Sequence, residues 1–253
     1  MTVEACAALV ERGDPDRFAA VMAAPPDARA KLWPLYAFNL EVARAPWVTK
    51  EPMISEMRLQ WWRDVVAEPR PRAHEVAGPL HALIREADLP ITALDRLAAA
   101  RQWDIYPDAF TDRAAFDTYL DDTGAGLMWL AARALGAPEA AEPVVRGFGW
   151  ATGLANFLRA VPDLEARGRT PLVDGRPGAV RDLAADGLRC IARARIGRAA
   201  IGAGAPALLA GWQAETLLRQ VQADPMVVAE GRMGLSEFSR RGRLIWQGLT
   251  GRW

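Results

Sequence analysis

The 253-residue sequence predicts an all-α protein. Along most of the chain, apolar residues recur three and four positions apart, the spacing of a helix that buries one face. Strand signals are almost absent, because no stretch keeps a period-two alternation and no Asn-Gly pair indicates a hairpin. With 51% hydrophobic and 25% charged residues, the chain can bury a large core. We find no internal repeat or low-complexity tract, and we expect a single domain over residues 1–253.

Proline and glycine residues mark the expected helix boundaries. Helices are predicted over residues 3–12, 16–22, 27–46, 53–66, 80–87, 92–106, 112–135, 143–161, 180–200, 206–223, 225–231 and from 235 onwards. Asp14 is expected to cap the second helix, with Pro15 in its first turn. Gly124 and Gly126 interrupt the helix over residues 112–135. Pro162 is expected to disturb the end of the helix over residues 143–161.

The stretch from residue 32 to residue 66 contains two helices joined by a short loop at residues 47–52. In the first helix, a buried face is predicted for Leu32, Leu35, Tyr36 and Asn39. In the second helix, a buried stripe is predicted for Ile54, Met57, Trp61 and Val65. A buried amide needs hydrogen-bonding partners, so Asn39 is a candidate for a pocket floor. The other interpretation is a core Asn satisfied by a neighbouring backbone group.

Overall charge excludes a general nucleic-acid binder, since 31 basic residues balance 31 acidic ones. Cys6 and Cys190 form neither a metal-binding spacing nor a disulfide framework, which favours a reducing compartment. His74 and His81 lie seven residues apart among Pro, Arg and Glu. We expect both to be exposed and without a structural role, and the alternative is a metal-binding pair.

Membrane contact is expected to be peripheral at most. The first residues lack the order of a signal peptide, and the longest uncharged run, residues 199–214, is too short to span a bilayer. The segment from Arg240 to Trp253 mixes arginines with Trp and Leu. It fits a helix on an anionic membrane surface, or a tail that packs Trp246 on the domain. A cytoplasmic location follows, with membrane contact limited to the surface.

Two sequence runs carry a resemblance to a known family. Leu35-Tyr36-Ala37-Phe38 and Arg58-Leu59-Gln60-Trp61-Trp62-Arg63 resemble the opening of the squalene/phytoene synthases. The resemblance implies an isoprenoid-synthase-type helical bundle around a central cavity. In that family two aspartate-rich motifs hold Mg²⁺ against a prenyl diphosphate. At the first motif this chain has Ala43, Arg44 and Trp47.

The second motif is also depleted of acids. Asn156, Leu158 and Arg159 match the family, as do Arg167, Gly168 and Arg169. The acidic positions hold Ala160, Asp163 and Leu164, so Asp163 is the one matching carboxylate. Arg44 is open to three interpretations: an ion pair with Asp163, direct binding of a phosphate, or a solvated surface side chain.

The resemblance favours the family's non-catalytic branch, whose members are complex I assembly factors. It implies an isoprenoid or lipid ligand or a respiratory-complex partner, and no metal cofactor. The pocket and former motif positions are Tyr36, Phe38, Asn39, Ala43, Arg44, Trp47, Asn156, Arg159, Ala160, Asp163 and Arg169. A third possibility is a dimeric structural protein with a closed pocket.

The alternative function is a prenyltransferase that condenses prenyl diphosphates with a rearranged Mg²⁺ site. The available acids are Glu41, Glu56, Asp64, Asp117, Asp121 and Asp122. Three or more of these acids in one cleft with Asp163 would favour the enzyme. A cleft walled by Ala43, Trp47, Ala160 and Leu164 would oppose it.

Overall fold

The computed structural model describes residues 2–253, and within them the regular structure is helical and no strand occurs. This confirms the predicted all-α class. The helices are α1 (Val3–Gly13), α2 (Pro15–Ala23), α3 (Pro26–Arg44), α4 (Pro52–Ala67), α5 (Ala77–Ala87), α6 (Ile91–Ala100), α7 (Arg113–Leu120), α8 (Gly126–Ala134), α9 (Glu142–Ala166), α10 (Pro177–Ile196), α11 (Ala214–Ala223), α12 (Met226–Ala229) and α13 (Glu237–Thr250). Segments of 3-10 helix are η1 (Ala45–Trp47), η2 (Arg101–Asp104), η4 (Glu139–Ala141) and the longer η5 (Arg198–Gly211), and η3 (Asp121–Ala125) is a π turn.

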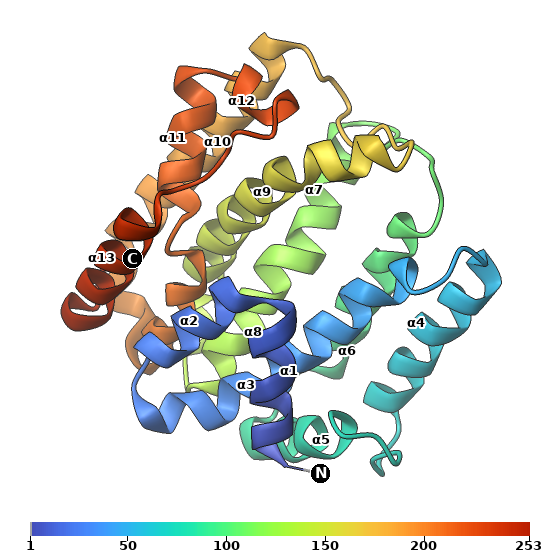
Figure 1. The fold of residues 1–253 in the computed structure, drawn as a ribbon. Helices are drawn as coiled ribbons and strands as arrows, with labels where there is room; N and C mark the ends of the chain where they lie inside the picture. The colour runs from blue at the N-terminus through green and yellow to red at the C-terminus, as the bar shows by residue number, and fades with distance from the viewer. Residues whose placement is uncertain (1) are drawn as a thin grey trace.

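Helix α9 runs through the middle of the bundle (Figure 1). It packs against α8 and η3 along one side and against α10 and α11 along the other. Helix α3 lies across the N-terminal part of the bundle and contacts α1, α5, α6 and α8. A single cluster of buried apolar side chains extends from Cys6 to Trp253. The central elements α3, η3, α8 and α9 therefore share one core.

The boundary between α1 and α2 follows the predicted capping chemistry. The Asp14 carboxylate accepts a hydrogen bond from the Arg17 backbone N–H at 3.0 Å, and Pro15 is the first residue of α2. The second Asp14 oxygen lies 3.2 Å from Arg17 Nε. The cap therefore also fixes the direction of the Arg17 side chain.

The α3 face is confirmed, since Leu32, Leu35, Tyr36 and Asn39 are all buried. The predicted α4 stripe is wrong at Ile54 and Met57, which are 45% and 65% exposed. Val65 is buried as predicted and Trp61 is half-buried, and Leu59 and Trp62 are buried in place of the first two. Apolar residues lie on two adjacent faces of α4, and spacing alone did not show which face meets α6.

The expectation of an exposed His81 is also wrong. His81 is buried in α5, and its Nε2 lies 2.6 Å from the Val65 carbonyl oxygen. The imidazole thereby joins α5 to the last turns of α4. His74 is half-buried and stacks edge-on against Trp61 and Trp62. Both histidines have structural contacts.

Small residues allow η3 and α9 to touch. A Cβ atom added at Gly149 would lie 2.7 Å from Ala125 Cα, and one added at Gly124 would lie 2.9 Å from Gly153 Cα. The glycines that interrupt the predicted helix over residues 112–135 lie in and just after a π turn, the usual form of a bulge inside an α-helix. This bulge turns the η3 backbone onto α9.

Two other boundaries differ from the sequence expectations. Helix α9 continues through Pro162 to Ala166, so the N–H that this proline lacks does not end the helix. The expected helix over residues 206–223 begins instead as the 3-10 segment η5, with Gly202 at φ 56°, and α11 starts at Ala214. The longer α9 carries Ala160 and Leu164 on a continuous helix.

Candidate functional site

A cavity of about 310 Å³ lies between α2, α3, η1, η2, α7, η3, α8 and α9. Its apolar wall consists of Ala43, Trp47, Leu120, Leu127, Phe157, Ala160 and Leu164. Ala43 and Trp47 come from α3 and η1, while Ala160 and Leu164 come from two successive turns of α9. The two segments where the family resemblance places metal-binding acids therefore meet at one cavity, and both present apolar side chains to it.

A second, more polar cavity of about 390 Å³ adjoins the first. The two share four lining residues: Arg17, Asn39, Arg101 and Asn156. The polar part extends past Thr152 and Arg159 to Trp212 in the segment after η5. Together the two parts form an amphipathic central cavity with an apolar end and a polar end, the usual composition of a small-molecule site.

At the junction, Arg101 belongs to a buried polar network. Its Nη1 donates to the Tyr119 hydroxyl oxygen at 2.9 Å and lies 3.4 Å from Asp104 Oδ2. Tyr119 in turn donates to Asp104 at 3.0 Å. Burial raises the pKa of the Asp104 carboxyl, and the neighbouring Arg101 opposes that rise. Burial also raises the pKa of Tyr119, which keeps the hydroxyl protonated.

The other carboxylates of the cavity are paired with arginines too. Arg17 pairs with Asp14, and its guanidinium lies 5.0 Å from the Tyr36 ring centre. Arg159 Nη1 lies 3.0 Å from Asp16 Oδ2, and Arg240 of α13 also contacts that carboxylate. Each acid that lines either part of the cavity therefore has a guanidinium partner.

Six of the positions selected from the sequence line the cavity: Asn39, Ala43, Trp47, Asn156, Arg159 and Ala160. Tyr36 and Phe38 are buried beside it in the core. The Phe38 ring packs edge-on against Trp62 at 5.5 Å, and burial raises the pKa of Tyr36 to about 12. These two aromatics support α3, and neither is among the lining residues.

Arg44 and Asp163 do not meet. Both are exposed, and no ion pair joins them within residues 2–253. Arg44 lines a separate surface hollow with Glu41 and Arg58. The ion pair considered for Arg44 is therefore absent from the described residues. The Arg44 side chain is instead exposed to solvent.

Arg169 is buried and has a structural position. Its guanidinium donates to the backbone carbonyl oxygens of Trp103 at 3.1 Å, Asp104 and Tyr106. It also lies 5.1 Å from the ring centres of Trp47 and Trp103. Burial lowers the pKa of Arg169. The side chain joins the turn after α9 to the segment around η2.

Arg17, Arg101, Asp104 and Tyr119 line the cavity but were not selected as site residues from the sequence. One signal for Arg101 was available. It follows Leu94 and Leu97 on the apolar face of the predicted helix, where a charged residue is uncommon. Arg17 gave no such signal, because it follows a turn and looks like a solvent-facing residue.

The cavity does not fit the Mg²⁺ ions that the family resemblance implies. Mg²⁺ prefers carboxylate and other oxygen ligands, and the facing positions Ala43, Trp47, Ala160 and Leu164 supply none. No group of three or more His, Cys, Asp or Glu side chains in the described residues is arranged to hold a metal ion. Asp104, the acid among the residues that line this apolar part, is engaged by Arg101 and Tyr119.

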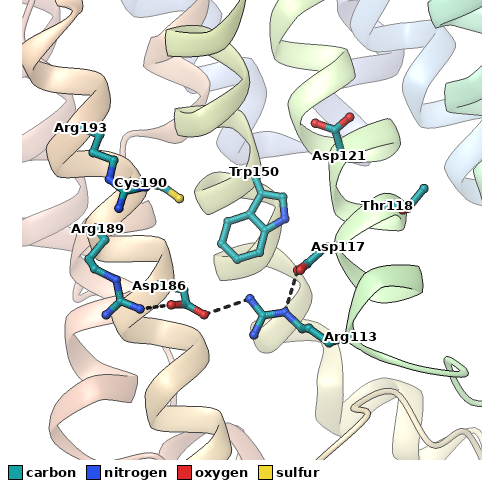
Figure 2. A pocket seen from close by; sticks show the side chains of 9 residues that line it. All are labelled: Arg113, Asp117, Thr118, Asp121, Trp150, Asp186, Arg189, Cys190 and Arg193. Carbon is teal, nitrogen blue, oxygen red and sulfur yellow. Dashed lines mark hydrogen bonds and ion pairs between the residues drawn. The ribbon is translucent and has the colours of Figure 1, made fainter.

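The acids considered for a relocated metal site lie elsewhere. Figure 2 shows Asp117 and Asp121 at a separate surface hollow of about 620 Å³, between α7 and α10 with Trp150 at its base. There Arg113 joins Asp117 to Asp186, at 2.8 and 3.0 Å. Asp121 and Asp122 face Arg146 and Arg96, respectively. This hollow is larger than either part of the central cavity, but its acids are tied to arginines.

The fold and the cavity define an all-α protein of the isoprenoid-synthase type. A sequence profile for squalene/phytoene synthase matches residues 10–173. The chain belongs to the squalene/phytoene synthase family.

The curated relatives are named assembly factors. The chain is 25% identical over 161 residues to "NADH dehydrogenase (ubiquinone) complex I, assembly factor 6" of Homo sapiens, covering 62% of this chain and 48% of the human protein. It is 28% identical over 178 residues to the homolog in Drosophila melanogaster, covering 66% of this chain and 53% of the fly protein. The chain therefore spans about half the length of the curated relatives it matches.

Two solved structures share the fold. A dehydrosqualene synthase in complex with a ligand superposes with a TM-score of 0.79 at 13% identity, covering 98% of this chain and 95% of the other. A squalene synthase from Alicyclobacillus acidocaldarius has a TM-score of 0.60 at 17% identity, covering 98% and 94%. These likenesses confirm the predicted helical bundle. No helix in residues 2–253 is both long and apolar enough to cross a membrane.

Proposed function

We propose that this chain is a non-catalytic member of the family that binds an isoprenoid or another lipid in its central cavity and acts in the assembly of a respiratory complex. The observation that supports this most directly is the cavity wall formed by Ala43, Trp47, Ala160 and Leu164. Fold alone does not carry an enzymatic function when the reacting groups differ. The names of the curated relatives favour an assembly role.

The cavity supports the lipid part of the proposal. Its apolar end offers Leu127, Phe157 and Leu164 to a hydrocarbon chain, and its polar end offers arginines and amides to a head group. We also propose that residues 1–253 form one domain, since one core cluster extends from Cys6 to Trp253. A closed, purely structural pocket is less consistent with two adjoining cavities.

The first experiment separates binding from catalysis. Purified protein is titrated calorimetrically with farnesyl diphosphate in Mg²⁺ and in EDTA, and the mixture is analysed for squalene- and phytoene-like products. We expect binding that EDTA does not weaken, and no product. Ala160→Phe, which fills the apolar end, should weaken binding at least tenfold. Mg²⁺-dependent binding with product formation would instead establish the prenyltransferase alternative.

The assembly role needs a cellular test. The gene is deleted in the source organism, and assembled complex I is measured on native gels together with its NADH oxidation. We expect less assembled complex, restored by the wild-type chain and not by Ala160→Phe. Normal complex I combined with loss of an isoprenoid product would contradict the assembly role.

We further propose peripheral contact with an anionic lipid surface through α13. Phe238, Ile245, Trp246 and Leu249 of this helix are 90%, 61%, 59% and 82% exposed. The helix carries three arginines and one acid, Glu237. An exposed apolar face flanked by arginines fits an anionic bilayer surface. The alternative was a tail that packs Trp246 on the domain. The segment does contact the domain, but through Trp253, whose ring lies 4.6 Å from that of Phe148, while Trp246 is mostly exposed.

A further inference from the structure

The outer face of α4 carries an apolar stripe that the rest of residues 2–253 leaves uncovered. Met53 and Met57 are 71% and 65% exposed, and Ile54 lies beside them at helical spacing. Val48, in the loop between η1 and α4, is also exposed. Figure 1 shows α4 at the edge of the bundle, where it packs on α6, η1, η2 and α3. The exposed residues therefore form one continuous face of a helix rather than scattered surface positions.

A surface hollow of about 380 Å³ continues this stripe. Arg58 and Trp61 line the hollow, and they lie one turn after Ile54 and Met57 on the same face of α4. Val48 lines the hollow as well, so it borders both the stripe and the hollow. The whole surface, the α4 patch, consists of Val48, Met53, Ile54, Met57, Arg58 and Trp61.

The charged residues of the hollow carry an excess of positive charge. Arg44 and Arg58 are exposed on its rim, and Glu41 is the one acid that lines it. The ion pairs within residues 2–253 include none of these three side chains. Two guanidiniums beside an apolar face favour a partner that brings carboxylates next to its own apolar residues.

The other charges near the stripe do not reverse this preference. Lys50 and Glu51, just before α4, are both exposed and carry opposite charges. Glu56 is half-buried and accepts a hydrogen bond from the Tyr106 hydroxyl at 2.6 Å. The two unpaired guanidiniums of the hollow therefore set the sign of the charge that the patch selects.

The geometry of the patch favours a helical partner. The patch is the side of a helix, so it has no open sheet edge to which a partner could add a strand. A second helix can pack its ridges against such a face, and flexible Met side chains adapt to the shape that meets them. The eight-residue step from Met53 to Trp61 is about 12 Å long, which an amphipathic helix of about three turns covers.

The place of α4 in the bundle favours a protein over a lipid surface. Figure 1 shows α4 and α13 on opposite sides of the molecule. A bilayer that meets the exposed face of α13 therefore leaves the α4 patch open. A second copy of the chain fits less well, because a twofold dimer would place the patch, with its positive excess, against itself.

We infer that the α4 patch is a docking surface for an acidic amphipathic helix of a partner protein. The partner's apolar side chains pack on Met53, Ile54 and Met57, and its carboxylates meet Arg44 and Arg58. This inference rests on the assembly role proposed above and names the surface that would carry it. The site is separate from the central cavity, since no residue of α4 lines either part of that cavity.

The first test titrates the full chain calorimetrically with three designed helical peptides. One has leucines on one face with glutamates beside them, the second has lysine in place of each glutamate, and the third is a scrambled form of the first. We expect the glutamate peptide to bind at least tenfold more tightly than the others. Met53→Ser/Met57→Ser should weaken it at least tenfold, and Arg44→Glu/Arg58→Glu should reverse the preference toward the lysine peptide. Ile196→Ser, at an exposed position on α10, is the matched control.

The second test asks whether the same surface acts in the cell. Met53→Ser/Met57→Ser replaces the wild-type chain in the source organism, and assembled complex I is measured on native gels. We expect at least a threefold loss of the complex, while the purified variant keeps its circular dichroism melt and its farnesyl diphosphate affinity.

The outcomes separate the patch from the assembly role itself. If the variant supports assembly or binds the glutamate peptide as wild type does, the α4 patch is not the docking surface, although the assembly role stands. A wild-type dimer that Met53→Ser/Met57→Ser dissociates in light scattering would show that a second copy covers the patch. If the wild-type chain itself makes no difference to complex I, the assembly role fails.

Discussion

The guanidinium of Arg167 lies 4.6 Å from the centre of the Trp47 ring, and that of Arg169 lies 5.1 Å from it. Trp47 belongs to η1 and closes part of the apolar end of the cavity. Both arginines belong to the turn after α9. The indole of Trp47, at a position where the family resemblance places an acid, thus joins η1 to the turn after α9. These are the two segments where the resemblance places the metal-binding motifs.

Trp47→Ala should lower the free energy of unfolding by about 1–2 kcal/mol, because each cation–π contact contributes about 0.5–1 kcal/mol. The measurement is urea unfolding followed by circular dichroism at pH 7. Trp246→Ala is the control, since Trp246 is 59% exposed on α13 and should change stability by less than about 0.5 kcal/mol. Equal losses for the two variants would show that the Trp47 contacts contribute no stability.

The contact between η3 and α9 predicts opposite effects for two glycines on the same helix. Gly149→Ala should destabilise the fold by about 1–3 kcal/mol, since its Cβ would meet the Ala125 backbone at 2.7 Å. Gly147→Ala has no atom within 4 Å of its new Cβ, so it should stabilise α9 by about 0.5–1 kcal/mol. Thermal and urea unfolding of both variants test the pair. Similar effects of the two substitutions would rule out the close approach.

Local features of the fold could be predicted from the sequence because their cause is local. Asp14 and Pro15 predict the start of α2, and Leu32 and Leu35 predict the buried face of α3. The α4 register and the burial of His81 depend on which neighbouring helix each face meets. That information is tertiary, and spacing along the chain does not contain it.

The cavity was predicted in part for a similar reason. Ala43, Trp47 and Ala160 were selected through the family resemblance, and the structure places all three on one wall. Arg17 was missed because it follows a turn, as a solvent-facing arginine does, and Arg101 was missed although its place on the apolar face of the predicted helix was a signal. The pairs of Arg17 with Asp14 and of Arg101 with Asp104 each join residues three positions apart, but only the tertiary structure brings the two arginines to one cavity.

Glu215 predicts a specific pH dependence of stability. Hydrogen bonds from Arg195 hold the pKa of this carboxyl at about 2. The folded-state pKa is lower than the unfolded value of about 4.3, so the contribution is fully present above that value and is lost as pH falls through about 2. At pH 7, Glu215→Gln should cost about 1–2 kcal/mol, because the pair joins α10 to α11 and Glu215 is largely buried.

Urea unfolding of wild type and Glu215→Gln at pH 7, 4 and 2.5 tests this dependence. The difference between the two proteins should shrink as the pH falls. Glu230→Gln provides the control, since Glu230 and its partner Arg232 are both exposed and their pair should contribute less than about 0.5 kcal/mol. A difference that stays constant down to pH 2.5 would show that the Glu215 charge does not stabilise the fold.

The outer face of α13 predicts binding to anionic vesicles, because its inner face is fixed to the bundle. Arg240 pairs with Asp16, and a Cβ added at Gly248 would lie 3.2 Å from the Ala23 carbonyl oxygen. The exposed apolar residues therefore point outward.

In sedimentation with phosphatidylglycerol vesicles, the triple variant Phe238→Ser/Ile245→Ser/Leu249→Ser should bind at least tenfold more weakly than wild type. Neutral phosphatidylcholine vesicles should bind wild type weakly, because attraction to the arginines is lost. Ile196→Ser, at an 87% exposed position on α10, should bind as wild type does. If the triple variant keeps full vesicle binding, or instead converts a dimer to a monomer in light scattering, then α13 meets a protein surface rather than lipid.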